Sequence, residues 1–212
     1  MFTKSSQIIL VISKDYNSST GVLQRVERNN NSWSKVDSSI KVFLGRNGIA
    51  PADGLCKVNH TDKTIKNEGD GKSPSGVFSI GRLFGNKKEL NTKMPYFQVS
   101  KNIHCVDDVT SKLYNKIVTK QDGYTSYETM LRDDGLYNLG AVVQYNSNPT
   151  IKTRGSCIFL HISADRATAG CTSMKEPKLR EVLKWLDEEK KPLFIQLPEA
   201  TYNGLDLGSL IK

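Results

Sequence analysis

The chain has 212 residues, of which 37% are hydrophobic and 25% are charged, as in ordinary globular proteins. No apolar run approaches the roughly 20 residues of a membrane-spanning helix, so the sequence predicts no transmembrane segment. The formal net charge is +8 at pH 7, but the basic residues are scattered and form no nucleic-acid-binding motif, so we expect no nucleic acid partner.

Alternating or continuously apolar segments predict three strands in the first 44 residues, at 7–13, 22–27 and 33–44. Glycine and proline then predict a loop over 45–54, and a short edge strand follows over 57–63.

The glycine-rich loop 67–76 leads into a predicted strand at 77–80. It contains the Gly-Lys-Ser of a phosphate-binding loop. However, Lys66 stands where that motif requires glycine, and Pro74 would break the helix that must follow. The sequence therefore excludes a phosphate-binding loop here.

Residues 86–150 have the least regular pattern, with one predicted strand at 141–145. His104, Cys105 and Asp107 lie close together in this region and suggest a metal site. Neighbouring residues on a strand point to opposite faces, so this set does not converge on one ion. We predict no metal and no cofactor.

The nearly continuous apolar segment from Cys157 to Ile162 predicts a buried strand, and His161 lies near its end. A polar loop follows, and Gly170 then precedes Cys171, ten residues after the histidine. Cysteine attacks as its thiolate and needs a base or a cation beside it, so His161 and Cys171 are candidate catalytic residues. Gly170 is expected to let the backbone turn sharply and to present N–H groups to an oxyanion. In the alternative interpretation, His161 is a strand-end residue and Cys171 a small buried hydrophobic side chain.

Pro177 is compatible with the first turn of a helix, and apolar residues follow it at one-face helical spacing. These residues are Leu179, Val182, Leu183 and Leu186. Pro192 ends this amphipathic helix, residues 193–197 form a last strand, and the tail 199–212 is expected to be loosely attached. Many short strands with one clear helix predict a mostly β fold, a sandwich or a barrel.

The histidine, the loop and Thr168-Ala169-Gly170-Cys171 are one of several motifs that follow each other from near residue 40 to near residue 197. The others are Gly45-Arg-Asn-Gly48, the segment 66–78, Met94-Pro-Tyr96, Cys105-Val-Asp-Asp108, Tyr114-Asn115, Tyr127-Glu-Thr-Met130, the segment 155–161, Thr172-Ser-Met174 and Trp185-Leu-Asp187. In this order they resemble one branch of the L,D-transpeptidase (YkuD-like) family. The resemblance implies a single-domain mixed β-sandwich over residues 1–212, with the strands of residues 1–40 belonging to it and the amphipathic helix near its C-terminus.

The resemblance also implies a chemistry, which is acyl transfer on peptidoglycan stem peptides through a thioester on Cys171. His161 would take the thiol proton or pair with the thiolate, and the backbone N–H groups of Gly170 and Cys171 would hold the oxyanion. A backbone carbonyl, that of Ile162 or Ser163, would orient the imidazole. The donor would be the L-centre of the third stem residue, with the terminal D-Ala leaving, and an amine on another stem would accept it to form a 3→3 crosslink.

The chain departs from the family pattern at two places around the cysteine. Ala169 stands where histidine is frequent, and Thr172 and Ser173 stand where an apolar residue and Arg or Asn are usual. Substrate binding is therefore expected to involve other side chains. The candidates are Thr168, Ser173, Arg154 and Arg166. Four more residues in matching segments are candidates to line the cleft, but the interpretation we favour is that they tie loops together by hydrogen bonds. They are Glu68, Asp107, Glu128 and Tyr145.

Two other functions stay open. If water intercepts the thioester, the same site makes the protein an L,D-carboxypeptidase that trims tetrapeptide stems. If Cys171 is an inert buried thiol, the domain is a catalytically inactive cell-wall-binding module.

The resemblance further makes Cys105 and Cys157 a candidate disulfide, because both lie in matching segments and the family implies an oxidising compartment. Two buried thiols are the alternative, and Cys56 is left over in either case. The expected location is the bacterial cell envelope, periplasmic or exported. The sequence carries no signal peptide, so we expect a leader to have been removed, and we expect a monomer.

Overall fold

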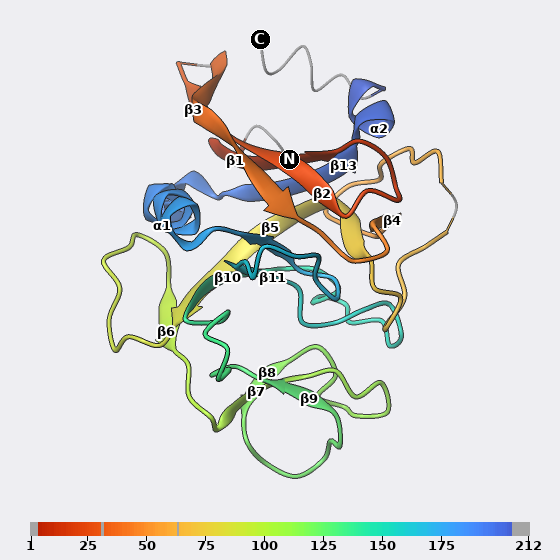
Figure 1. Ribbon diagram of the computed structural model, residues 1–212, viewed down its shortest axis with the longest axis vertical. Coiled ribbons are helices and arrows are strands. Elements are labelled where there is room, and N and C mark those ends of the chain that lie inside the picture. The colour runs from red at the N-terminus through yellow and green to blue at the C-terminus, as the bar shows by residue number, and fades with distance from the viewer. Residues whose placement is uncertain (1–3, 31, 63, 205–212) are drawn as a thin grey trace.

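The computed structural model describes residues 4–30, 32–62 and 64–204. Its larger sheet has ten strands, in the order β10-β11-β12-β3-β2-β1-β13-β5-β4 with β6 beside β5 (Figure 1). Their bounds are β1 (Gln7–Ser13), β2 (Thr20–Asn29), β3 (Ser32–Phe43), β4 (Ile49–Pro51), β5 (Ser73–Gly85), β6 (Tyr96–Gln98), β10 (Leu139–Val143), β11 (Phe159–Ile162), β12 (Thr172–Met174) and β13 (Leu193–Pro198). Because β5 also pairs with β10, the sheet closes on itself and encloses an apolar core.

The strand β1 explains how the two faces of the sheet are filled. It pairs antiparallel with β2 and parallel with β13, so it lies inside the sheet. Ile9 and Val11 belong to the main core, whereas Ile8 and Leu10 pack in a second cluster on the opposite face. A strand buried on both faces must be continuously apolar, which is why residues 7–13 show no alternation.

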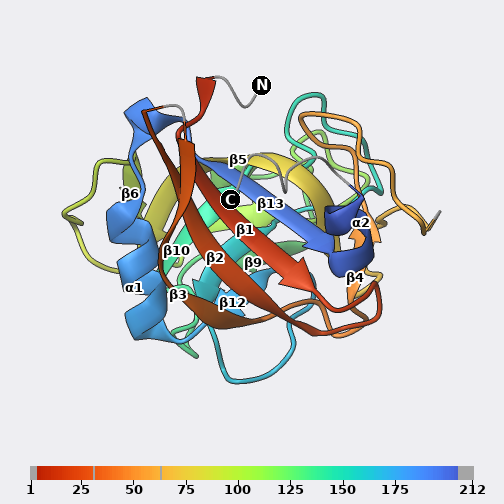
Figure 2. The same cartoon turned by 90° about the horizontal axis from the view of Figure 1, so that it is seen from above.

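The helix α1 (Glu176–Trp185) covers one side of the main core, and α2 (Glu199–Asn203) lies at the other side of the molecule (Figure 2). Leu179, Val182 and Leu183 of α1 are buried, as the helical spacing predicts, and Leu186 is buried just after its end. A short 3-10 turn over Glu188–Lys190 leads into β13. The prediction of a mostly β fold with a C-terminal amphipathic helix is confirmed. No helix in the part of the chain that the structure describes is long and apolar enough to cross a membrane.

Two predictions from the local sequence, the strand over 57–63 and the loop over 45–54, differ from the structure because pairing with β5 decides how this region folds. The predicted strand over 57–63 is wrong, because residues 57–62 form no strand; residue 63 lies outside the described residues. The predicted loop 45–54 instead contains β4, which pairs in parallel with the start of β5, Ile49 opposite Ser73. Backbone hydrogen bonds from Ala52 and Leu55 extend this contact along β5. The hydrogen-bonding edge of β5 is therefore already paired with residues that precede residue 57.

The tail 199–212 is only partly described. Residues 199–203 form α2 instead of a loose extension, and Thr201 is buried there. Its hydroxyl lies 2.9 Å from the hydroxyl of Tyr16, which ties this helix to the turn after β1. Residues 205–212 lie outside the described residues.

A second, three-stranded sheet covers the far side of β10 and β11 (Figure 1). We call it the cap sheet, and it consists of β7 (Ile103–Val106), β8 (Ile117–Thr119) and β9 (Tyr127–Thr129), with β7 in the middle. A disulfide joins Cys105 of β7 to Cys157, just before β11. Asn115 adds a second link, since its side chain donates to the Tyr145 carbonyl and accepts from the Cys157 N–H. The cap sheet is thus fastened next to the strand that carries His161.

Replacing Leu183 by alanine tests whether α1 contributes to the core. The side chain is 1% exposed, and truncation of such a leucine leaves a cavity, so we expect the free energy of unfolding to fall by about 2–5 kcal/mol. Urea denaturation measures it. The matched control is Lys184→Ala on the exposed face of the same helix, which should change stability by less than about 0.5 kcal/mol. Equal effects of the two substitutions would contradict this role of α1.

Candidate active site

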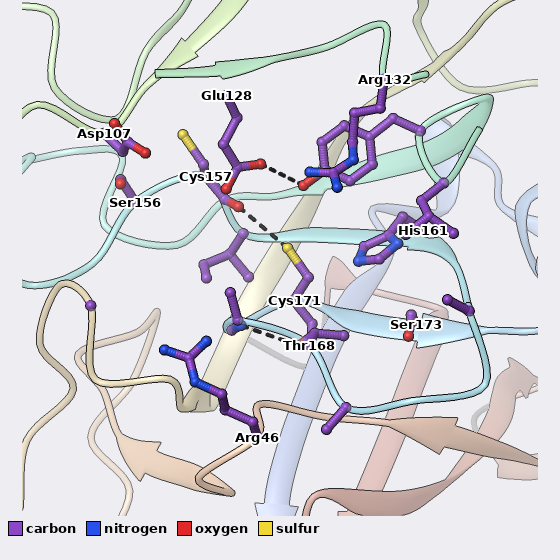
Figure 3. Close-up of a pocket in the computed structure, with 18 of the residues that line it drawn as sticks. Arg46, Asp107, Glu128, Arg132, Ser156, Cys157, His161, Thr168, Cys171 and Ser173 are labelled. Carbon is purple, nitrogen blue, oxygen red and sulfur yellow. Dashed lines mark hydrogen bonds between the residues drawn. The ribbon is translucent and has the colours of Figure 1, made fainter. Parts of the chain in front are cut away.

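Cys171 lies immediately before β12 and is 7% exposed. Its sulfur accepts the Phe159 N–H at 3.3 Å, and its thiol donates to the Cys157 carbonyl at 3.4 Å (Figure 3). Burial raises the pKa of the Cys171 thiol to about 12, and the negative charge of Glu128 adds to the shift, whereas the Phe159 N–H opposes it. The resting cysteine is therefore a protonated thiol at neutral pH.

His161 lies on β11 and is 6% exposed. Its Nδ1 is 2.7 Å from the Ile162 carbonyl oxygen. A carbonyl only accepts hydrogen bonds, so Nδ1 carries the proton and Nε2 is left as the acceptor. Burial lowers the pKa of His161 to about 4. The imidazole is therefore neutral at pH 7, with its basic nitrogen available and its tautomer set by the Ile162 carbonyl.

Parallel pairing of β11 with β12 brings the two residues together. His161 lies opposite Ser173 in this register, and Cys171 precedes Ser173 by two residues, so it belongs to the same face of the sheet. Both side chains line one cavity of about 320 Å³, and Figure 3 shows the imidazole and the sulfur facing each other across it. The structure thus places together the two residues that the sequence proposes as catalytic. Their low and high pKa values favour an uncharged pair over a thiolate–imidazolium ion pair.

The loop before Cys171 is held by Thr168. Its backbone N–H donates to the Leu44 carbonyl, and its carbonyl accepts from Arg46. Its hydroxyl donates to the Cys171 carbonyl at 2.6 Å and accepts the Gly170 N–H at 3.1 Å. Thr168 does line the cavity, but these contacts make it a clamp on the loop rather than a free substrate ligand.

The surroundings of Gly170 favour glycine through tight packing and not through the expected sharp turn. Its φ is not positive, and a Cβ on it would lie 3.2 Å from the Lys72 carbonyl oxygen. The glycine therefore permits close approach of the segment before β5. Its N–H is occupied by Thr168 in the resting structure, so it reaches an oxyanion only if that hydrogen bond is exchanged.

The remaining predicted substrate ligands divide between two places. Arg166 and Ser173 line the cavity, and the Ser173 hydroxyl is buried without a hydrogen-bond partner. Arg154 does not line it; it borders another hollow, and its carbonyl accepts from the Tyr145 hydroxyl. The structure therefore does not bring Arg154 into the cavity of His161 and Cys171, and its role in substrate binding stays a prediction.

Several cavity residues were not predicted as site residues. The acidic ones are Glu68, Asp107 and Glu128, and the basic ones are Arg46, Lys66 and Arg132. Tyr137 also lines the cavity, and its ring meets the His161 imidazole edge-on at a centroid distance of 5.2 Å. Glu68 does tie loops together, since Oε2 accepts from Tyr114 and Ser156 at 2.6 Å each.

The sequence indicated some of these cavity residues, but it did not show that they meet at one site. The three acidic residues lie in segments that match the family pattern, yet a sequence does not show which loops meet across a cavity. Residues 86–150 contribute Asp107, Glu128 and Arg132 through the cap sheet and its connections.

The Cys105–Cys157 disulfide adjoins the nucleophile. Cys157 has φ of 55°, a left-handed conformation that is uncommon outside glycine and asparagine. This conformation turns its carbonyl toward the Cys171 thiol, while its sulfur bonds to β7. Cys56 is free and partly buried.

A family model and several solved structures match this chain. The family model described as the L,D-transpeptidase catalytic domain, YkuD, matches residues 17–195. Among solved structures, Bd1075 of Bdellovibrio bacteriovorus aligns with 99% of this chain and 56% of its own, at 13% identity and a TM-score of 0.46. The helical cell shape determining protein Pgp2 of Campylobacter jejuni aligns with 91% of this chain and 48% of its own, at 14% identity and a TM-score of 0.46. The chain therefore spans about half the length of these two proteins. A search of curated proteins found no match.

The protonation state of Cys171 is tested by alkylation with iodoacetamide between pH 6 and pH 10, in a Cys56→Ser background. Because the thiol pKa is raised to about 12 and only the thiolate reacts, the rate should rise about tenfold per pH unit without a plateau. Mass spectrometry follows the adduct, and Cys171→Ser is the control. A rate that is constant between pH 6 and pH 8 would show that the resting state is an ion pair.

Removal of the disulfide tests how the cap sheet is held. The two cysteines are 52 residues apart, so Cys105→Ala with Cys157→Ala should lower the free energy of unfolding by roughly 2–5 kcal/mol. Urea denaturation without reductant measures the change. The control Cys56→Ala leaves the disulfide intact and should stay within about 1 kcal/mol of the parent. An unchanged midpoint in the double variant would contradict the structural role.

Proposed function

The chain belongs to the YkuD family of L,D-transpeptidase catalytic domains, and from that membership we propose that it is a cysteine acyltransferase acting on peptidoglycan stem peptides. The observation that carries the proposal is the pair in the cavity. A buried thiol and an imidazole with a defined tautomer line the same space, with the basic nitrogen of the imidazole unused.

The first half-reaction is acylation of Cys171. Nε2 of His161 takes the thiol proton while the sulfur attacks the carbonyl carbon at the L-centre of the third stem residue. Since both groups start uncharged, the ion pair forms only as the reaction proceeds. The Ile162 carbonyl, held at 2.7 Å from Nδ1, stabilises the imidazolium that results. The imidazolium then protonates the leaving amine of the terminal D-Ala, and the thioester remains.

The oxyanion of this step needs hydrogen-bond donors beside Cys171. The backbone N–H groups of Gly170 and Cys171 are the proposed donors, and each such donor is worth about 3–4 kcal/mol of barrier in acyl transfer. Thr168 shares the Gly170 N–H in the resting state. The loop must therefore release that hydrogen bond when the tetrahedral intermediate forms.

In the second half-reaction an amine of another stem attacks the thioester and gives a 3→3 crosslink. We place the reaction in the cell envelope, where the polymer lies, and the Cys105–Cys157 disulfide supports an oxidising compartment.

Mass spectrometry of the purified protein mixed with a disaccharide-tetrapeptide tests the proposal. We expect an acyl adduct on Cys171 and a crosslinked dimer, both lost in Cys171→Ala and reduced by about a hundredfold or more in His161→Ala. A trimmed tripeptide without dimer identifies an L,D-carboxypeptidase with the same site. The absence of any adduct on Cys171, with the tetrapeptide and with a carbapenem, would leave an inactive wall-binding module as the function.

A further inference from the structure

A second acid–base pair lies in the cavity and takes no part in the acylation described above. Glu128 of β9 accepts a hydrogen bond from the Tyr137 hydroxyl on Oε2 at 2.5 Å. Both residues line the cavity with Cys171, and Figure 3 shows Glu128 directed from the cap sheet toward the sulfur. The Glu128 charge raises the pKa of the Cys171 thiol, whereas the Tyr137 hydroxyl lowers it. A second substrate that enters this cavity therefore meets both the sulfur and the carboxylate.

The cavity is lined by side chains of both charges, and two of its carboxylates, those of Glu128 and Asp107, are not held in salt bridges within the described residues. Asp107 lines the same cavity, and its Oδ1 is completely buried without a hydrogen-bond partner. Arg132 hydrogen bonds to Asp134 at 2.6–3.2 Å, and its guanidinium lies over the Tyr137 ring, 5.2 Å from the ring centroid. Lys66 is committed to Asp70 at 2.7 Å in the same way.

Burial raises the pKa of Glu128, and the charges of Asp107 and Glu68 raise it further, against the Tyr137 hydrogen bond and the charge of Arg132. A carboxylate whose proton affinity is increased in this way is a better base. Its ionised form is also destabilised until a cation comes next to it. Both properties suit a group that first attracts an ammonium and then takes a proton from it.

The acceptor of the proposed function presents that chemistry. A primary aliphatic amine is an ammonium at neutral pH and has no lone pair with which to attack. It must be bound beside the thioester and deprotonated there. We propose that Glu128, positioned by Tyr137, is a further catalytic residue that binds the acceptor ammonium and removes its proton. This inference rests on the proposed function and adds the acceptor subsite to it.

The step balances as follows. The acceptor R–NH₃⁺ gives one proton to the Glu128 carboxylate and becomes R–NH₂. Its nitrogen forms a bond to the thioester carbon, and the carbon–sulfur bond breaks. His161 takes the second proton from nitrogen and passes it to the leaving sulfur, which restores the thiol, and Glu128 returns its proton to solvent. Water carries no charge for this wall to attract, so the subsite favours transfer over hydrolysis.

The test compares a charged and an uncharged nucleophile. Wild type and Glu128→Gln are supplied with the tetrapeptide donor and either a second stem, whose amine is charged, or methoxyamine, which is neutral at pH 7. The glutamine oxygen still accepts from the Tyr137 hydroxyl, so this hydrogen bond is kept. For the charged acceptor we expect kcat/KM to fall by about a hundredfold and hydrolysis to gain. Transfer to methoxyamine should stay within about twofold of wild type.

The matched control is Glu89→Gln, the same change on an exposed side chain, which should leave both transfers unchanged. Should Glu128→Gln misfold, Asp107→Asn on the same wall serves instead, and the same selective loss is expected, though smaller.

The outcomes separate this inference from the function on which it rests. Equal loss with both nucleophiles, or no loss with the charged one, overturns the role of Glu128 while an adduct on Cys171 upholds the acyltransferase. A wild type that forms the adduct but only hydrolyses it overturns the acceptor subsite as well. A wild type without any adduct on Cys171 overturns both proposals.

Discussion

The parallel pairing of β11 with β12 is the constraint on which the site depends. It sets His161 opposite Ser173 and so puts the imidazole and the Cys171 thiol on one face of the sheet. The connection between these strands, residues 163–171, is short for a parallel crossover and contains no helix. It is held in place because Thr168 bonds to the segment after β3 at one end and to Cys171 at the other. The backbone and the hydroxyl of Thr168 thus link the segment after β3 to Cys171, and the Ser73 hydroxyl adds a second hydrogen bond to the Cys171 carbonyl.

Burial then decides the charge state of the reactive groups. Cys171 and His161 are both buried, and burial disfavours both the thiolate and the imidazolium. The resting site is therefore a neutral pair. Such a thiol is protected from oxidation and from thiol exchange, because both reactions need the thiolate.

The cap sheet links stability to the chemistry of the site. Its disulfide holds Cys157, whose left-handed backbone presents a carbonyl to the Cys171 thiol. Its strand β9 supplies Glu128 to the same cavity. The covalent link that stabilises the cap therefore also fixes one hydrogen-bond partner of the nucleophile. Loss of this link would loosen both together.

Sequence patterns alone determined the mostly β class, the strand β1 and the helix α1, which follow from local periodicity. The spacing of His161 and Cys171 left a non-catalytic role open, and the resemblance to a known family singled them out as the candidate pair. Tertiary structure decided the rest. The edge strand β4, the position of Arg154 away from the cavity and the shared cavity of Glu128 and Cys171 each depend on which distant segments pair or fold over one another. The physical reason is that a hydrogen-bonded edge or a shared cavity belongs to two parts of the chain at once. Neither part shows in its own residues which partner will lie against it.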